Sequence, residues 1–129
     1  PTMADIMITL STDSTVYAGS IEQEADWAKS GGPLWYPLPT MPRRASEGCW
    51  VYFILGGYMV GRARIDKIRS KKLWTDRTHK GKPLKHKGPA VVYSSVQVAT
   101  SAVKHSDFQG YRYVAGPLLM KFHKAFEAP

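Results

Sequence analysis

Apolar positions gather in several short runs, some alternating with polar positions and one apolar throughout, while two other stretches have a helical period. The runs typical of strands cover residues 5–10, 49–55, 58–65, 90–100 and 110–114. One helix is predicted over residues 20–31, where Ser20 and Gln23 form a capping box. A second is predicted over residues 117–126, where Pro117 suits the first turn. This order of elements predicts an α+β fold.

The most regular pattern is a predicted hairpin, GCWVYFILGGYMVGRARIDKI, residues 48–68. Residues 49–55 are apolar at every position, so we expect both faces of that strand to be covered and Trp50 to lie in the core. Gly56-Gly57 suits the tight turn. In the returning strand one face carries Met59, Gly61, Ala63 and Ile65, and the other carries Tyr58, Val60, Arg62 and Arg64.

Residues 33–42 contain four prolines, which predict a stiff, extended loop and not a strand inside a sheet. With five or six short strands and two helices, 129 residues suffice for one domain, residues 1–129. We expect a small mixed sheet curled into a partial barrel, with two short flanking helices.

Charge is concentrated in one segment. Residues 69–89 hold eight cationic side chains against Asp76 alone, a net charge of +7, whereas the other residues carry ten cationic and nine acidic side chains. Clustered cations of this kind attract the phosphate backbone of a nucleic acid. We therefore predict a basic internal loop over residues 69–89.

The remaining composition narrows the class of protein. A hydrophobic content of 43% is typical of a folded domain, and no apolar run reaches the length of a membrane helix. No signal-peptide pattern opens the chain, and Pro1 suits removal of an initiator methionine. The single Cys49 excludes an internal disulfide. We expect a cytoplasmic protein without a membrane partner.

Motifs for catalysis, metal binding or a cofactor are missing from the sequence. The four histidines have no ligand spacing, and neither a Walker loop nor a dinucleotide fingerprint occurs. His105-Ser106-Asp107 contains the residue types of a triad, but a triad is defined by geometry and not by adjacency. We expect no cofactor, no metal and no catalytic residue.

The hairpin resembles a known family. A glycine, an apolar strand, a tight turn and an apolar-Val-Gly-x-Ala-x-Ile strand are similar to the central hairpin of PUA-like domains, nearest to the EVE and ASCH types. The matching residues are Gly48, Val51, Phe53, Val60, Gly61, Ala63 and Ile65. The resemblance covers about a fifth of the chain and implies a PUA-like pseudobarrel. It also implies RNA or DNA binding, in some members with a modified base held in an aromatic pocket.

Two features depart from that family. The Gly-x-Lys-x-x-Glu-x-Arg motif of many ASCH-type domains does not occur, which weakens any catalytic role taken from them. The loop after Trp35 is also rich in proline (YPLPTMP) instead of small polar residues.

The cations and one tryptophan of the basic segment suit nucleic acid, because cations contact phosphates and an indole stacks on an unpaired base. The alternative is a solvated loop whose lysines maintain solubility, and Arg62 and Arg64 are equally compatible with ordinary exposed strand positions. The predicted nucleic-acid-binding residues are Arg62, Arg64, Lys71, Lys72, Arg77, Lys80, Lys82, Lys85 and Lys87. Arg43-Arg44 could join this surface.

A base pocket would need aromatic faces for stacking and polar groups to bind the base edge. The predicted pocket residues are Trp35, Tyr36, Trp74, Gln109 and Arg112. For Gln109 and Arg112 the alternative is a plain final strand, with Tyr111 and Tyr113 on one face and Arg112 on the other.

The sequence thus predicts a nucleic-acid-binding module that uses a basic loop for phosphates and an aromatic pocket for an unpaired or modified base. One alternative is a small enzyme acting on nucleotides or nucleic-acid bases. Another is a phage or mobile-element protein that binds an acidic protein partner.

Overall fold

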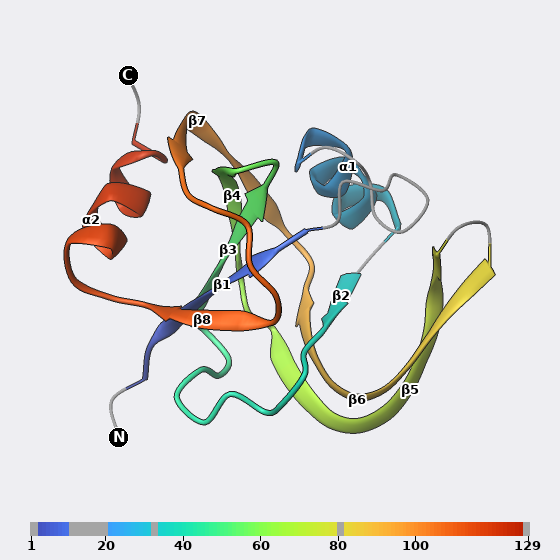
Figure 1. Cartoon of the computed structure of the whole chain (residues 1–129). Coiled ribbons are helices and arrows are strands. Elements are labelled where there is room, and N and C mark those ends of the chain that lie inside the picture. The colour runs from blue at the N-terminus through green and yellow to red at the C-terminus, as the bar shows by residue number, and fades with distance from the viewer. Residues whose placement is uncertain (1–2, 11–20, 32–33, 80–81, 128–129) are drawn as a thin grey trace.

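In the computed structural model the chain forms eight strands and two helices (Figure 1). The structure describes residues 3–10, 21–31, 34–79 and 82–127. In chain order the elements are β1 (Asp5–Thr9), α1 (Ile21–Gly31), β2 (Leu34–Pro37), β3 (Trp50–Leu55), β4 (Tyr58–Arg64), β5 (Lys67–His79), β6 (Lys82–Tyr93), β7 (Val96–Lys104), β8 (Tyr111–Val114) and α2 (Gly116–Lys124).

The strands form two sheets instead of one. The larger sheet has the order β7-β4-β3-β1-β8, in which β1 is parallel to β3 and the other neighbours are antiparallel. The smaller sheet has the order β2-β6-β5 and is antiparallel throughout. The predicted mixed α+β class is confirmed, and neither sheet is a closed barrel.

Two hydrophobic cores lie on opposite faces of the larger sheet. On one face Ile6, Ile8 and Phe53 pack with Val91 and Tyr93 of the smaller sheet. On the other face Met7, Tyr52, Ile54 and Val114 pack with Phe122 of α2. Because successive strand residues point to opposite faces, β1 and β3 must be apolar at nearly every position. This explains the uninterrupted apolar run that the sequence showed at residues 51–54.

Packing at Gly61 is close. A Cβ atom there would lie 2.5 Å from Cγ1 of Ile21 and 2.9 Å from the Gln97 carbonyl oxygen. The register between β4 and β7 also shifts between Met59 and Gly61, as in a bulge. Helix α1 therefore approaches β4 at a position that only glycine fits.

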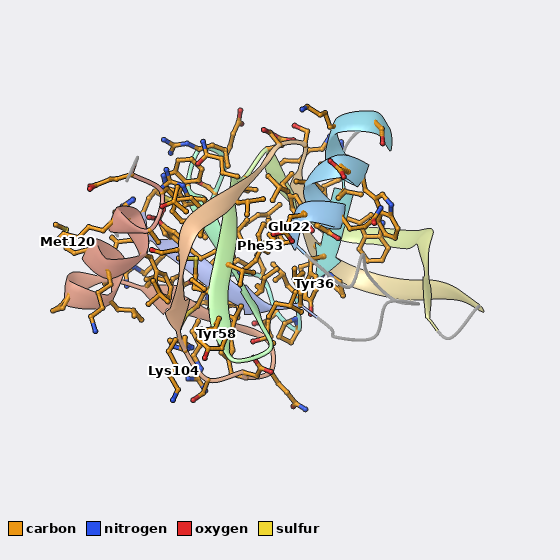
Figure 2. The ribbon with its side chains drawn as sticks, turned by 90° about the horizontal axis from the view of Figure 1, so that it is seen from above. Glu22, Tyr36, Phe53, Tyr58, Lys104 and Met120 are labelled. Carbon is orange, nitrogen blue, oxygen red and sulfur yellow. The ribbon has the colours of Figure 1, made fainter. Side chains whose placement is uncertain are left out.

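The predicted basic loop is wrong in its conformation, because the segment consists of two paired strands. Strands β5 and β6 pair from Lys67↔Val92 at the root to His79↔Lys82 at the far end. In Figures 1 and 2 the far part of this hairpin projects away from the larger sheet. Sequence reasoning detects strands by apolar alternation, which residues 69–89 lack, although backbone pairing does not require it. We call β5 and β6 together the basic ribbon.

The proline-rich loop also needs a correction at its start. Residues Leu34–Pro37 form β2, an edge strand that pairs with β6, with Pro37 opposite Ala90 at its last position. Proline is tolerated there because an edge strand has one side without ladder partners. Residues 38–49 then connect the small sheet to the larger one without regular structure.

Among the described residues, no helix has both the length and the apolar character needed to cross a bilayer.

Candidate nucleic-acid interface

The predicted phosphate-binding cations lie along both strands of the basic ribbon. Lys71, Lys72 and Arg77 are on β5, and Lys82, Lys85 and Lys87 are on β6. The register places Leu73 opposite Lys87 and Arg77 opposite Leu84. Lys80 lies outside the described residues. The ribbon backbone thus brings cations that are distant in sequence onto two strands about 4.8 Å apart.

Arg62 does not extend the positive surface of the ribbon. It lies on the α2 face of the larger sheet, where its guanidinium carbon is 3.8 Å from the Trp50 ring centroid and 4.2 Å from that of Phe126. Its Nε donates a hydrogen bond of 2.8 Å to Oε1 of Gln97. Planar guanidinium groups stack well on aromatic faces, so Arg62 is occupied inside the molecule.

Arg64 and Trp50 belong to the same cluster. The Arg64 guanidinium carbon is also 3.8 Å from the Trp50 centroid, and its NH1 donates to the Gly48 carbonyl at 2.6 Å. Trp50 is half-buried and packs against the α2-side core, so the expectation that it lies in the core is met only in part. We call Trp50, Arg62, Arg64 and Phe126 the closed arginine cluster.

A histidine and a tyrosine complete the closed arginine cluster on its inner side. Nδ1 of His123 lies 3.1 Å from NH1 of Arg62 and 3.2 Å from the Tyr52 hydroxyl. Burial raises the pKa of the Tyr52 hydroxyl, and the neighbouring Arg62 acts in the opposite direction. This network joins β3 and β4 to α2.

The predicted base pocket is not assembled around the aromatic residues chosen for it. Trp35 is only 2% exposed and packs with Ala90 and Val92, so it is a core residue and not a pocket wall. Tyr36 is half-buried, and its hydroxyl donates a hydrogen bond to the Thr9 carbonyl oxygen. As successive residues of β2, Trp35 and Tyr36 point to opposite faces of the small sheet and pack in different clusters, so they cannot form one pocket wall.

The other pocket candidates also lie apart. Trp74 is on β5, and Gln109 is exposed in the turn before β8. Arg112 is exposed, with its guanidinium carbon 4.6 Å from the Phe108 ring centroid. Arg112 pairs with Met7, whose side chain belongs to the α2-side core, so it shares that face of the larger sheet.

A different hollow, which we call the tyrosine hollow, lies between the loop at residues 40–44 and β8. It is open to solvent and encloses about 760 Å³. In Figure 1 the chain after β2 passes below β8 in this region. The residues that line the hollow are Thr40, Met41, Arg43, Arg44, Tyr111 and Tyr113.

Both sides of the tyrosine hollow are held in place. The Arg44 backbone N–H donates to the Tyr113 hydroxyl at 3.1 Å, and the Ala4 N–H donates to the Arg44 carbonyl at 2.6 Å. The Tyr111 hydroxyl lies 3.3 Å from Oγ1 of Thr40. Gly110, with φ of 76°, lets the start of β8 approach Pro39 closely. The loop and the strand therefore form one surface.

The tyrosines of this hollow face the small sheet. Tyr111 packs against the core that contains Val91 and Tyr93 of β6. The loop itself starts at the ribbon, because the Leu38 N–H donates to the Pro89 carbonyl at 2.9 Å. The tyrosine hollow and the ribbon root thus share one face of the larger sheet, while the closed arginine cluster lies on the other.

Sequence reasoning missed the tyrosine hollow because its two halves are about 70 positions apart along the chain. The available signals were the Tyr-Arg-Tyr alternation of β8 and the adjacent Arg43-Arg44. Alternation correctly placed Tyr111 and Tyr113 on one strand face and Arg112 on the other. Their contact with residues 40–44 depends on tertiary packing.

Glu24 is an acid in the first turn of α1. In the structure it is fully buried, and its Oε1 accepts a hydrogen bond of 2.8 Å from the Tyr93 hydroxyl. A buried carboxylate needs such donors to offset the loss of water. Glu24 therefore ties α1 to β6.

Comparison with known proteins matches this chain to no family model, no curated protein and no solved structure. The resemblance of the central hairpin to PUA-like domains stays a prediction. Among the residues that the structure describes, no three His, Cys, Asp or Glu side chains gather as metal ligands would.

Proposed function

We propose that the protein binds nucleic acid through the basic ribbon, with its cations against the phosphate backbone. The observation that carries this proposal is the charge of residues 69–89, eight cations against one acid on a near-neutral body. Neutralising phosphates releases condensed counterions, which favours binding wherever cations are concentrated. A surface that serves only solubility mixes both signs of charge.

The backbone form of the ribbon supports this proposal further. A two-stranded antiparallel ribbon is narrow enough to enter the major groove of B-DNA, which is about 12 Å wide. The far part of the ribbon projects from the body, so the larger sheet does not cover it (Figures 1 and 2). Cations on both strands would then contact phosphates on both sides of a groove.

Charge neutralisation tests the proposal. In one variant Lys80, Lys82, Lys85 and Lys87 are replaced by Gln, and binding to a labelled duplex is measured by fluorescence anisotropy over a range of salt. We expect most of the affinity to be lost. The slope of log K against log salt should become shallower by up to roughly 1 for each lysine that contacts a phosphate.

The matched control removes the same charge from elsewhere. Lys29, Lys104, Lys121 and Lys124 are exposed and lie outside the ribbon, so replacing these four by Gln should leave most of the affinity. Equal losses in the two variants would mean that only net charge matters and would contradict the proposal. Capture of an acidic protein that survives nuclease treatment, with no oligonucleotide binding, would favour the protein-partner alternative.

A further inference from the structure

The tyrosine hollow combines aromatic rings with cations and has no acid among the described residues that line it. The rings of Tyr111 and Tyr113 meet edge to face, with centroids 5.8 Å apart and planes at 81°. The Arg44 guanidinium carbon lies 5.2 Å from the Tyr113 centroid. A hollow of this kind favours a ligand that combines a planar ring, which can contact the tyrosines, with an anionic group, which can contact an arginine.

Arg43 is the cation in the tyrosine hollow that is open to such a ligand. It is exposed, and it has no hydrogen bond, ion pair or ring contact with the described residues. Arg44, in contrast, contributes its backbone N–H and its guanidinium to Tyr113. The two arginines therefore have different roles. Arg44 positions the Tyr113 ring, and the planar guanidinium of Arg43 presents several N–H donors that suit a phosphate.

The size and position of the hollow suit a nucleotide. About 760 Å³ lies within the range of small-molecule sites, so the hollow can hold one nucleotide. It is on the same face of the larger sheet as the ribbon root, and Leu38 connects the two through Pro89. A strand held along the ribbon can thus continue toward the hollow.

We propose that the tyrosine hollow binds one unpaired nucleotide, with the base on the tyrosine rings and the phosphate at Arg43. As a site within a longer nucleic acid it rests on the proposed function of the ribbon. The hollow itself can be tested separately, because a mononucleotide does not require the ribbon.

The first test compares a blunt duplex with the same duplex carrying a single-stranded overhang. Stacking on an aromatic side chain contributes enough to affinity that Tyr113→Ala should weaken overhang binding by about tenfold. Binding to the blunt duplex should change by less than about twofold, since no unpaired base is present. Tyr113→Trp should restore the overhang preference because it keeps an aromatic face.

Matched controls separate the hollow from general aromatic or charge effects. Tyr58→Ala removes an exposed tyrosine at the start of β4 (Figure 2), outside the tyrosine hollow. It should leave the affinities for the blunt and the overhang duplex unchanged. Arg43→Gln should weaken overhang binding more than Lys104→Gln, which removes the same charge at a position outside the hollow. Thermal unfolding of each variant confirms that it is folded.

The second test uses adenosine 5′-monophosphate and the ring signals of Tyr111 and Tyr113 in NMR spectra. These signals should shift in the wild-type protein and in the ribbon variant, and the Tyr111 shifts should be lost in Tyr113→Ala. If the ribbon variant loses duplex binding while the nucleotide still shifts the tyrosines, both proposals stand. If no oligonucleotide binds but the shifts occur, the ribbon proposal fails and the hollow stands.

Two results would overturn the inference about the hollow. One is an equal loss of blunt and overhang binding in Tyr113→Ala. The other is the absence of any shift of the tyrosine signals by the mononucleotide. Either result would leave the ribbon proposal intact, provided that the salt dependence of duplex binding still follows the ribbon lysines.

Discussion

Two groups of arginine and aromatic side chains lie on opposite faces of the larger sheet, and they differ in how many partners their arginines have within the protein. In the closed arginine cluster Arg62 lies against two rings and bonds with Gln97 and His123. In the tyrosine hollow Arg44 holds one ring, and Arg43 has no partner among the described residues. The same residue types thus stabilise the fold on one face and leave donors open to a ligand on the other.

The difference follows from what covers each face. Helix α2 supplies His123 and the turn after it supplies Phe126, so two donors of Arg62 and its flat faces are used. The tyrosine hollow is bordered only by an irregular loop and the edge strand β8. Arginine beside an aromatic ring is therefore not by itself a sign of a binding site.

The largest expected effect is on stability. Arg62→Ala removes two ring contacts and the hydrogen bonds to Gln97 and His123, so the free energy of unfolding should fall by about 2–3 kcal/mol. Arg62→Lys should recover little of it because an ammonium group cannot stack as a plane. Urea unfolding measures both. A loss as small as that of an exposed arginine would show that the cluster is not closed.

A smaller effect should appear at high pH. Because the pKa of Tyr52 is raised in the folded protein, the unfolded chain releases that proton first as pH rises past about 10. The free energy of unfolding contributed by Tyr52 is therefore fully present below that pH and is lost above it. Tyr52→Phe lacks this loss.

The measurement compares unfolding of the wild-type protein and Tyr52→Phe from pH 8 to pH 11. The variant should be less stable by about 1 kcal/mol at pH 8, since it lacks the hydroxyl contact with His123. The difference in free energy of unfolding between the two proteins should shrink as pH rises past about 10. Tyr58→Phe is the control for removing one phenol. A gap that stays constant over this range would contradict the prediction.

The smallest effect belongs to the tyrosine hollow. Arg44→Gln should change the free energy of unfolding by less than about 0.5 kcal/mol, because the backbone N–H keeps its bond to Tyr113 and the side chain is exposed. Thermal unfolding measures this change. A loss of stability comparable to that of Arg62→Ala would show that both groups stabilise the fold and would contradict the proposed difference between them.

Local patterns predicted much of the fold. The hairpin at residues 50–64 and the two helices were visible in the periodicity of the sequence. The predicted core face of β4 was wrong at Met59, because the register shift before Gly61 turns Met59 to the α2-side core while Ala63 packs in the opposite one. Strands β5 and β6 were not, because a hairpin outside the core needs no apolar alternation. The split into two sheets was also missed, since it depends on β2 and β5 pairing with β6 and not with the strands of the larger sheet.

The candidate site could be predicted only in part. The concentration of cations is a property of composition, so the sequence showed it directly. Trp35 was placed in a pocket because a proline-rich segment suggested exposure, yet four residues of that segment pair with β6 and bury the indole. Arg62 was placed on a binding surface because alternation identifies a face but not what covers it.

Helix α1 lies between the two sheets and contacts both. It touches both sheets: Ile21 lies over Gly61 of the larger one, and Glu24 accepts from Tyr93 at the base of β6. A methyl group at position 61 would push Ile21, at the start of α1, away from β4, while the hydrogen bond from Tyr93 would still hold Glu24. The contact of α1 with the larger sheet would then be displaced while its bond to the smaller sheet remained, although neither the ribbon nor the tyrosine hollow had lost a residue.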